Sequence, residues 1–203
     1  MHIPDGYLDP LTAFMTWVVA VGYAYYAYKY SELRTKPELI LSLAAAVFVA
    51  QMLNWPLPGG TSLHFVGGAL VAILTGPFNA YFTMLMVLIV QTLIFQDGGI
   101  TTLGANAIAM GIVAPWAGYI VYKVLKTRIG TAGAASVAGW ISVAASGTAV
   151  GILIGLSTWF PYSLGISVPI MAIWHSILGV REGVITGLAV LYILRKAPHY
   201  IAT

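Results

Sequence analysis

Residues 79–95 read NAYFTMLMVLIVQTLIF, an apolar run that contains no charged side chain. A helix needs about 20 such residues to cross a hydrocarbon core of about 30 Å. The run also lacks the strict alternation of apolar and polar residues that is typical of the lipid-facing strands of membrane barrels. The stretch therefore predicts a membrane-spanning α-helix.

The rest of the chain has the same character. Of its 203 residues, 60% are hydrophobic and 7% are charged, and the mean hydropathy is +0.90, whereas soluble domains carry roughly 25% charged residues. We expect an all-α, polytopic transmembrane helical bundle that forms a single membrane domain over residues 1–203, with about seven spans. The expected spans are residues 11–28, 38–55, 64–77, 79–95, 103–125, 131–157 and 168–194.

The basic residues are distributed unevenly among the breaks between these spans. If the spans alternate in direction, one face of the membrane collects Lys29, Arg34, Lys36, Lys123, Lys126, Arg128, Arg195 and Lys196. Cytoplasmic loops carry an excess of Lys and Arg, so this face is expected to be cytoplasmic. The N-terminus and residues 1–10 are then extracellular, the C-terminus is cytoplasmic and the number of spans is odd.

Composition excludes several kinds of chemistry. The chain has no cysteine, so disulfides and thiolate metal ligands are excluded. It also has no G-x(4)-G-K-[ST] phosphate loop, so it cannot hydrolyse ATP by that route. The small excess of Lys and Arg indicates how the chain is oriented in the membrane. A nucleic-acid partner is not expected.

Polar groups and imidazoles gather at the outer ends of the expected spans. Besides His2 and His64, this face holds Gln51, Asn54, Gln91, Asp97 and Asn106. Polar groups at membrane depth are costly unless they face the bundle interior or a wet cavity. Their concentration on one face indicates a site that is open to the outside.

The first ten residues, MHIPDGYLDP, offer three nitrogen donors in succession. The amine of Met1, the amide nitrogen of His2 and the imidazole Nδ1 of His2 close a five-membered and a six-membered chelate ring in nearly one plane. A fourth nitrogen completes a square-planar site of the kind that suits Ni(II) or Cu(II), and His64 is the candidate. The residues alone leave two interpretations open: this metal site, or an ordinary tail with His64 as a helix-end residue.

Other features allow rival interpretations. His175 and Glu182, beside Arg181 in the last expected span, are the only candidate pair for an intramembrane enzyme, although a structural Arg181–Glu182 ion pair is favoured. The plentiful Tyr and Trp residues suit a vitamin-binding cavity, and a structural or sensory membrane protein is a further alternative. Glycines recur every four residues at Gly147, Gly151 and Gly155. This spacing indicates close packing between helices, and packing within the bundle is favoured over packing against a partner.

Three blocks of the sequence resemble one known family. They are MHIPDGYL at residues 1–8, GGTSLHFVGGALVAILTGPFNA at 59–80 and QDGGITTLGANAIAMGIVAPWAGY at 96–119. The chain is similar in these blocks to the CbiM/NikM family, the substrate-binding (S) components of cobalt/nickel energy-coupling-factor (ECF) transporters. The resemblance is strong from residue 1 to about 122 and weaker in HSILGVREGVITG at 175–187.

The resemblance implies a function, a ligand set and partners. Such proteins bind Ni(II) or Co(II) at the outer face of the cell membrane, and the matching ligands here are Met1, His2 and His64. The expected partners are a transmembrane coupling (T) component and cytoplasmic ATPase subunits, with a small extra membrane subunit left open. The chain is then a transport component and not an enzyme. The sequence leaves nickel and cobalt open, although square-planar geometry favours nickel.

Overall fold

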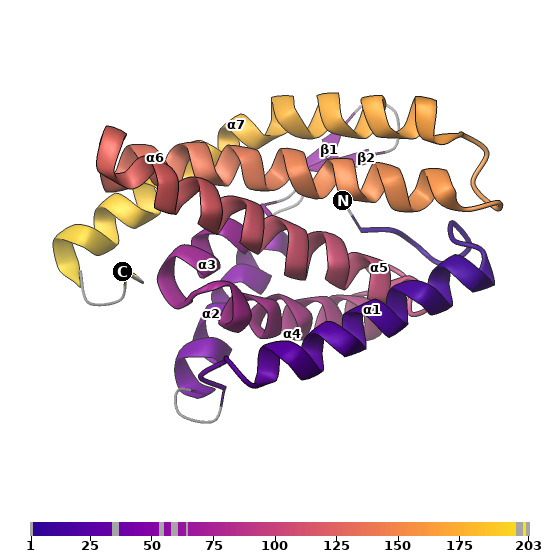
Figure 1. The fold of residues 1–203 in the computed structure, drawn as a ribbon, viewed down its shortest axis with the longest axis horizontal. Helices are drawn as coiled ribbons and strands as arrows, with labels where there is room; N and C mark the ends of the chain where they lie inside the picture. Colours follow the sequence, from indigo (N-terminus) through magenta and orange to yellow (C-terminus); the bar gives the residue numbers. More distant parts are fainter. Residues whose placement is uncertain are drawn as a thin grey trace.

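The computed structural model describes residues 2–33, 37–52, 55–57, 61–63, 65–197 and 201. Its helices are α1 (Pro10–Tyr28), α2 (Pro37–Met52), α3 (Gly68–Thr75), α4 (Pro77–Phe95), α5 (Leu103–Asn106), the π-helix η1 (Ala107–Val113), α6 (Ala114–Leu156) and α7 (Leu164–Lys196). They pack side by side as a bundle (Figure 1). The expected all-α architecture with several long apolar helices is confirmed.

Among the described residues, three helical segments are long and apolar enough to cross a membrane. They are Pro77–Phe95, the continuous run Leu103–Leu156 and Leu164–Lys196, while Pro37–Met52 is a shorter apolar helix. Large apolar side chains on the outside of the bundle, such as Leu11, Ile94 and Tyr192, are more than half exposed. An outer surface of this kind suits lipid and not water.

The expected span at 64–77 contains a much shorter helix. α3 has eight residues, which at 1.5 Å per residue extend only about 12 Å. Ala69, Val71, Ala72 and Ile73 are fully buried within it. The apolar character of this stretch therefore reflects its position inside the bundle, enclosed by other helices.

A short β-hairpin precedes α3, where the sequence analysis expected only a break. Strands β1 (Trp55–Leu57) and β2 (Thr61–Leu63) pair antiparallel, with Trp55 opposite Leu63. Periodicity could not predict it, because each strand has only three residues and too few positions to show an alternating pattern.

α6 consists of two antiparallel arms that meet at Gly130. This glycine has φ 75° and ψ 164°, a conformation that residues with a Cβ atom rarely adopt, and the chain reverses there (Figure 1). The Oγ of Ser142 in the second arm donates to the carbonyl of Ala114 in the first, at 2.8 Å. The reversal lies in the basic break KTRIG at residues 126–130.

The second arm of α6 packs closely against α7 along the glycine repeat. A Cβ atom at Gly147 would overlap the ring of His175, and one at Gly151 would lie 2.9 Å from the backbone of Val168. A Cβ at Gly155 would overlap the Oγ of Ser167. The repeat is therefore a seam between two helices of this chain, as the sequence analysis favoured.

Candidate metal-binding site

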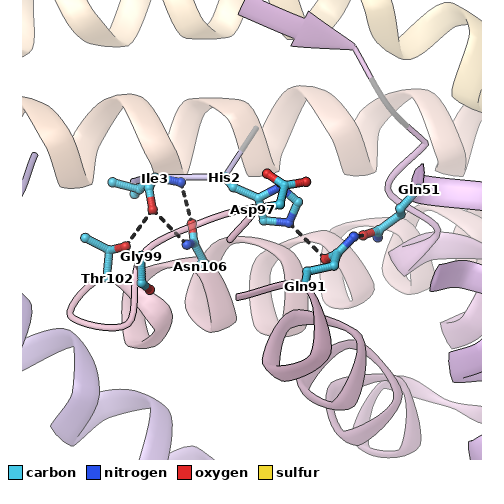
Figure 2. A network of polar contacts seen from close by, with 8 residues as sticks. All are labelled: His2, Ile3, Gln51, Gln91, Asp97, Gly99, Thr102 and Asn106. Atoms are coloured by element: carbon cyan, nitrogen blue, oxygen red, sulfur yellow. Dashed lines mark hydrogen bonds and ion pairs between the residues drawn. The ribbon is translucent and has the colours of Figure 1, made fainter. Parts of the chain in front are cut away.

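The N-terminal segment is fastened to the bundle through the backbone of Ile3. The amide of Ile3 donates to Asn106 Oδ1 at 2.8 Å, and Asn106 Nδ2 donates back to the Ile3 carbonyl at 3.1 Å. The same carbonyl accepts from the Thr102 hydroxyl and, at 3.0 Å, from the Gly99 amide (Figure 2). Both polar groups of this residue are satisfied, and its side chain is 1% exposed. The segment that begins at His2 is thus fastened to the bundle.

Asp5 holds the loop between α4 and α5 against this segment. Its carboxylate accepts from the amides of Ile100 and Thr101 at 3.1 and 2.8 Å, and hydrogen bonding, chiefly from the Thr101 hydroxyl, lowers the pKa of Asp5. A Cβ atom on Gly99 would overlap Asp5. The glycine allows the loop to approach the N-terminal segment this closely.

His2 lies at the centre of the site. Its side chain is 4% exposed, and Nδ1 lies 3.1 Å from Asp97 Oδ1. On the other side of the ring, Nε2 lies 3.1 Å from Gln91 Oε1 (Figure 2). Burial lowers the pKa of His2, and the hydrogen bond with Asp97 partly opposes that effect. A neutral imidazole is the form that binds a metal ion.

Two glutamines continue the site into the bundle. Gln91 is fully buried on α4 and Gln51 is 2% exposed on α2. Gln91 Nε2 donates to Gln51 Oε1 at 2.8 Å, and Gln51 Nε2 donates to the Val66 carbonyl at 2.6 Å. The network therefore connects the N-terminal segment with α4, with α2 and with the backbone just before α3.

The structure brings together five of the residues that the sequence analysis predicted for the site. These are His2, Gln51, Gln91, Asp97 and Asn106. Met1, Asn54 and His64 lie outside the described residues. Within the described part of the chain, no group of three His, Cys, Asp or Glu side chains could hold a metal ion. Donors from Met1, from His64 and from the backbone therefore remain a prediction.

Glu182 has a position that the sequence analysis did not anticipate. Its side chain on α7 is 4% exposed, and its two carboxylate oxygens accept from the amides of Val66 and Gly67 at 2.9 and 2.7 Å. The available signal was a lone acidic residue in an apolar span, which indicates a functional position by default. The ion pair with Arg181 stays a prediction.

His175, the other half of the pair considered for an intramembrane enzyme, bonds within its own helix. Its Nδ1 lies 2.8 Å from the carbonyl of Met171, one turn earlier in α7. The Glu182 carboxylate, in contrast, is engaged by the backbone before α3. The described contacts of the two side chains are therefore with separate backbone groups and not with each other.

Comparison with known proteins identifies the family. The family model described as "Cobalt uptake substrate-specific transmembrane region", CbiM, matches residues 2–200. The chain is 47% identical to the "Putative fused nickel transport protein NikMN" of Archaeoglobus fulgidus, over 99% of this chain and 68% of the relative. It is 34% identical to the "Fused nickel transport protein NikMN" of Rhodobacter capsulatus, over 100% of this chain and 64% of that relative.

A solved structure agrees with these relatives. The crystal structure of a truncated transition metal transporter superposes with a TM-score of 0.88 at 33% identity, covering 96% of this chain and 99% of the other. Likeness at this level extends over the whole bundle. The chain therefore belongs to the CbiM family, and it is a multi-pass substrate-specific membrane component of cobalt/nickel uptake, a transport protein and not an enzyme.

Proposed function

We propose that this chain captures one Ni(II) or Co(II) ion as cargo at its outer face, with nickel favoured. The donors are the amine of Met1, the amide nitrogen and Nδ1 of His2, and the imidazole of His64. The observation that carries the proposal is the buried His2 ring, which two acceptors orient in a segment fastened at Ile3. A disordered tail has no such fastening.

The clamp on Ile3 supports the chelate geometry. The peptide group between His2 and Ile3 is fixed by Asn106, which bonds the Ile3 amide. The His2 ring is fixed independently by Gln91 and Asp97. Backbone and ring of His2 are thus oriented before an ion arrives, and preorganisation of this kind lowers the entropic cost of binding.

Asp97 supports the accumulation of positive charge at Nδ1. Its Oδ1 lies 3.1 Å from that nitrogen, and its side chain is 36% exposed. A carboxylate in this position favours a cation bound at Nδ1, and its exposure gives an ion access from the outer face. We propose Asp97 as the residue at which the ion enters.

The proposed topology places this site outside the membrane core and the basic residues inside the cell. The end of α1, the reversal within α6 and the end of α7 lie on one side of the bundle (Figure 1). At or next to these regions in the sequence are Lys29, Lys123, Lys126, Arg128, Arg195 and Lys196. By the positive-inside rule this side is cytoplasmic. We propose seven crossings in one membrane domain, counting the short, enclosed α3 as part of the third, with the N-terminus outside.

The proposed partners supply the energy. A transmembrane coupling component and cytoplasmic ATPases are required, because this chain carries no phosphate loop. The chain covers 68% of the relative from Archaeoglobus fulgidus, whose name describes a fused protein. We keep a small extra membrane subunit, fused or separate, as a third kind of partner.

The test is a Ni(II) titration of the purified protein by calorimetry together with an optical spectrum. Three forms are compared: the native N-terminus, a form with one Gly before Met1 and a control with one Gly after Thr203. We expect the native and control forms to bind one ion with the yellow absorption of square-planar nickel, and the N-terminally extended form to lose that binding. Equal binding by all three forms would overturn the proposed ligand set.

A further inference from the structure

The hydrogen bonds that begin at His2 continue beyond Gln51 to α7. The Val66 carbonyl, which accepts from Gln51, belongs to the same peptide group as the Gly67 amide, which donates to Glu182 at 2.7 Å. A continuous path therefore runs from the imidazole through two side-chain amides and one peptide group to a buried carboxylate. His2 and Glu182 lie near opposite ends of the sequence, and the path joins them.

The donor and the acceptor of each hydrogen bond in the path can be assigned. A carbonyl oxygen can only accept, so the Gln51 atom that faces Val66 is the amide nitrogen and its oxygen faces Gln91. Gln91 must then donate to that oxygen, which turns its own oxygen toward His2 (Figure 2). The His2 Nε2 is consequently the donor of the first hydrogen bond, and every donor in the path points toward Glu182.

We propose that Glu182 and the two glutamines, Gln51 and Gln91, form a directed hydrogen-bond relay that holds the His2 proton on Nε2 and leaves Nδ1 open for the transported ion. The inference rests on the proposed function, because it assigns these residues to the same site. Metal-bound histidines generally donate their second ring nitrogen to such a partner, which sets the tautomer. In this protein the partner is itself oriented by a carboxylate on another helix.

The relay matters because a competing acceptor faces the other ring nitrogen. Asp97 Oδ1 lies at Nδ1 as closely as Gln91 Oε1 lies at Nε2, both at 3.1 Å. A neutral imidazole has one N–H and can donate to only one of them. The Asp97 carboxylate is a stronger acceptor than an amide oxygen. If the Gln91 oxygen is no longer held at Nε2, the proton moves to Nδ1, where it blocks the metal.

Glu182 also holds the segment that carries the other proposed imidazole ligand. Its two backbone contacts are with Val66 and Gly67, which follow His64 by two and three residues in the sequence. One carboxylate on α7 is therefore connected to His2 through the relay and contacts the backbone two and three residues after His64 in the sequence. We assign Glu182 as a positioning residue that acts through its neighbours and does not touch the ion.

Nuclear magnetic resonance of the imidazole nitrogens tests the relay directly. The purified full chain is labelled with ¹⁵N-histidine and kept free of metal at about pH 8, where an ordinary histidine is neutral. The chain has four histidines, and the His2→Ala variant assigns the His2 signals. We expect the wild-type His2 to carry its proton on Nε2. A wild-type ring with its proton on Nδ1 would overturn the relay.

Two substitutions of Gln51 distinguish a role in orienting hydrogen bonds from a role in filling space. Glu at this position loses the donor to the Val66 carbonyl but can only accept from Gln91, so Gln51→Glu should orient Gln91 without the link to Glu182 and keep the Nε2 proton. Leu can neither accept nor donate, so Gln51→Leu should move the proton to Nδ1 and weaken Ni(II) binding about 10-fold or more. If both variants keep the wild-type tautomer and affinity, the glutamines do not set the proton position and the proposal fails.

Glu182→Gln tests the far end of the relay. It should shift the His2 tautomer in the same direction as Gln51→Leu and weaken Ni(II) binding several-fold, and the two substitutions together should do little more than the larger alone. Thr186→Val is the matched control, because this residue lies one turn further along α7 and its buried hydroxyl has no hydrogen-bond partner among the described residues. Fully additive effects would show that Glu182 acts apart from the glutamines.

The outcomes distinguish the relay from the function on which it rests. If the wild-type chain binds Ni(II) only with its native N-terminus and Glu182→Gln changes neither tautomer nor affinity, the metal site stands and the role of Glu182 is wrong. If the wild-type chain fails to bind Ni(II), the proposed function fails at its first step. Should Glu182→Gln not fold, the two Gln51 variants decide on the relay alone.

Discussion

His2 and His175 are both shielded from solvent in an apolar protein, yet their rings have different partners. The nitrogens of His2 face Gln91 and Asp97, from α4 and from the loop that follows it. The Nδ1 of His175 faces the carbonyl of Met171 in its own helix. A ring held by several elements has a position that the whole fold determines, whereas a ring bonded to its own helix needs only that helix.

The difference shows what separates a binding site from a structural residue in this protein. Around His2, Gln91 is buried and oriented, Asp97 is partly exposed, and the backbone of the next residue is clamped from several sides. Around His175 the close contact is with Gly147, where the absence of a side chain makes room for the ring. The first arrangement selects one orientation of a donor nitrogen, and the second fills space between two helices.

The largest effect is expected from removing the His2 ring. His2→Ala deletes a donor nitrogen and should weaken Ni(II) binding more than about 100-fold, beyond the 10–100-fold that loss of a supporting residue costs. Calorimetric titration measures the affinity. The form with Gly before Met1 is titrated in parallel, because it tests the terminal amine as a second donor. Full Ni(II) affinity in His2→Ala would show that His2, like His175, is not a metal ligand.

The clamp on Ile3 should come second. Asn106→Leu removes its two hydrogen bonds to Ile3 and should weaken Ni(II) binding about 10-fold or more, because the backbone that follows the chelating residue His2 is held less firmly. The control is Ser142→Ala, which also removes a buried hydrogen bond, the one between the arms of α6. Ser142→Ala should lower thermal stability without changing Ni(II) affinity, and an equal loss of affinity in both variants would contradict a specific role for the clamp.

Asp97 should have a smaller effect that depends on pH. Asp97→Asn removes the charge beside Nδ1 and should weaken Ni(II) binding roughly 3- to 10-fold near neutral pH, by loss of attraction for the dication. The Asp97 contact raises the pKa of His2, so its removal lowers that pKa further. Competition by protons at His2 should then begin at a lower pH in the variant than in the wild type.

The pH dependence of the wild type provides the reference for that comparison. Binding should weaken as pH falls, since each donor must be deprotonated. A terminal amine has an ordinary pKa of about 7.7–8.0, so protonation of the Met1 amine should cause the first loss of Ni(II) affinity. Burial holds the pKa of His2 below its ordinary 6.5, so its contribution should appear only below that pH. Titrations of Ni(II) between about pH 5 and 8.5 measure both phases.

The smallest effect is expected at His175. His175→Gln keeps a polar side chain at the α6–α7 seam and should leave Ni(II) affinity within about twofold of wild type, since the two sites share no partner among the contacts described. Its thermal stability should fall, because the ring contacts at Gly147 are lost. A large loss of metal affinity would show that the seam and the site are coupled.

Part of the site could be predicted from residue type and position alone. Polar residues at the outer ends of apolar spans are rare and costly, so Gln51, Gln91, Asp97 and Asn106 were recognisable candidates. Glu182 was recognisable as unusual, but its partner was not. Its contacts are the backbone amides of Val66 and Gly67, and any residue has such an amide, so no side chain in the sequence marks them.

The fold was predictable to a similar degree. Long apolar runs such as 79–95 indicate helices, because only helices and closed barrels satisfy backbone polar groups in lipid. The expected span at 64–77 and the eight-residue helix α3 within it show where this inference weakens. An apolar stretch is compatible both with lipid and with the protein interior, so hydropathy does not distinguish a crossing helix from an enclosed one.

The sequence by itself determined that this chain is a helical membrane protein, that it has neither a cysteine nor a phosphate loop and that a histidine at position 2 could serve as a ligand. These properties follow from composition and from covalent order. The tertiary structure alone decided that Gln91 and Asp97 face the two nitrogens of that histidine and that Gln51 and Glu182 lie behind Gln91, because Gln51, Gln91 and Glu182 come from separate helices. The orientation of a hydrogen bond depends on where its partners lie in space, and only packing brings α2, α4 and α7 to one place.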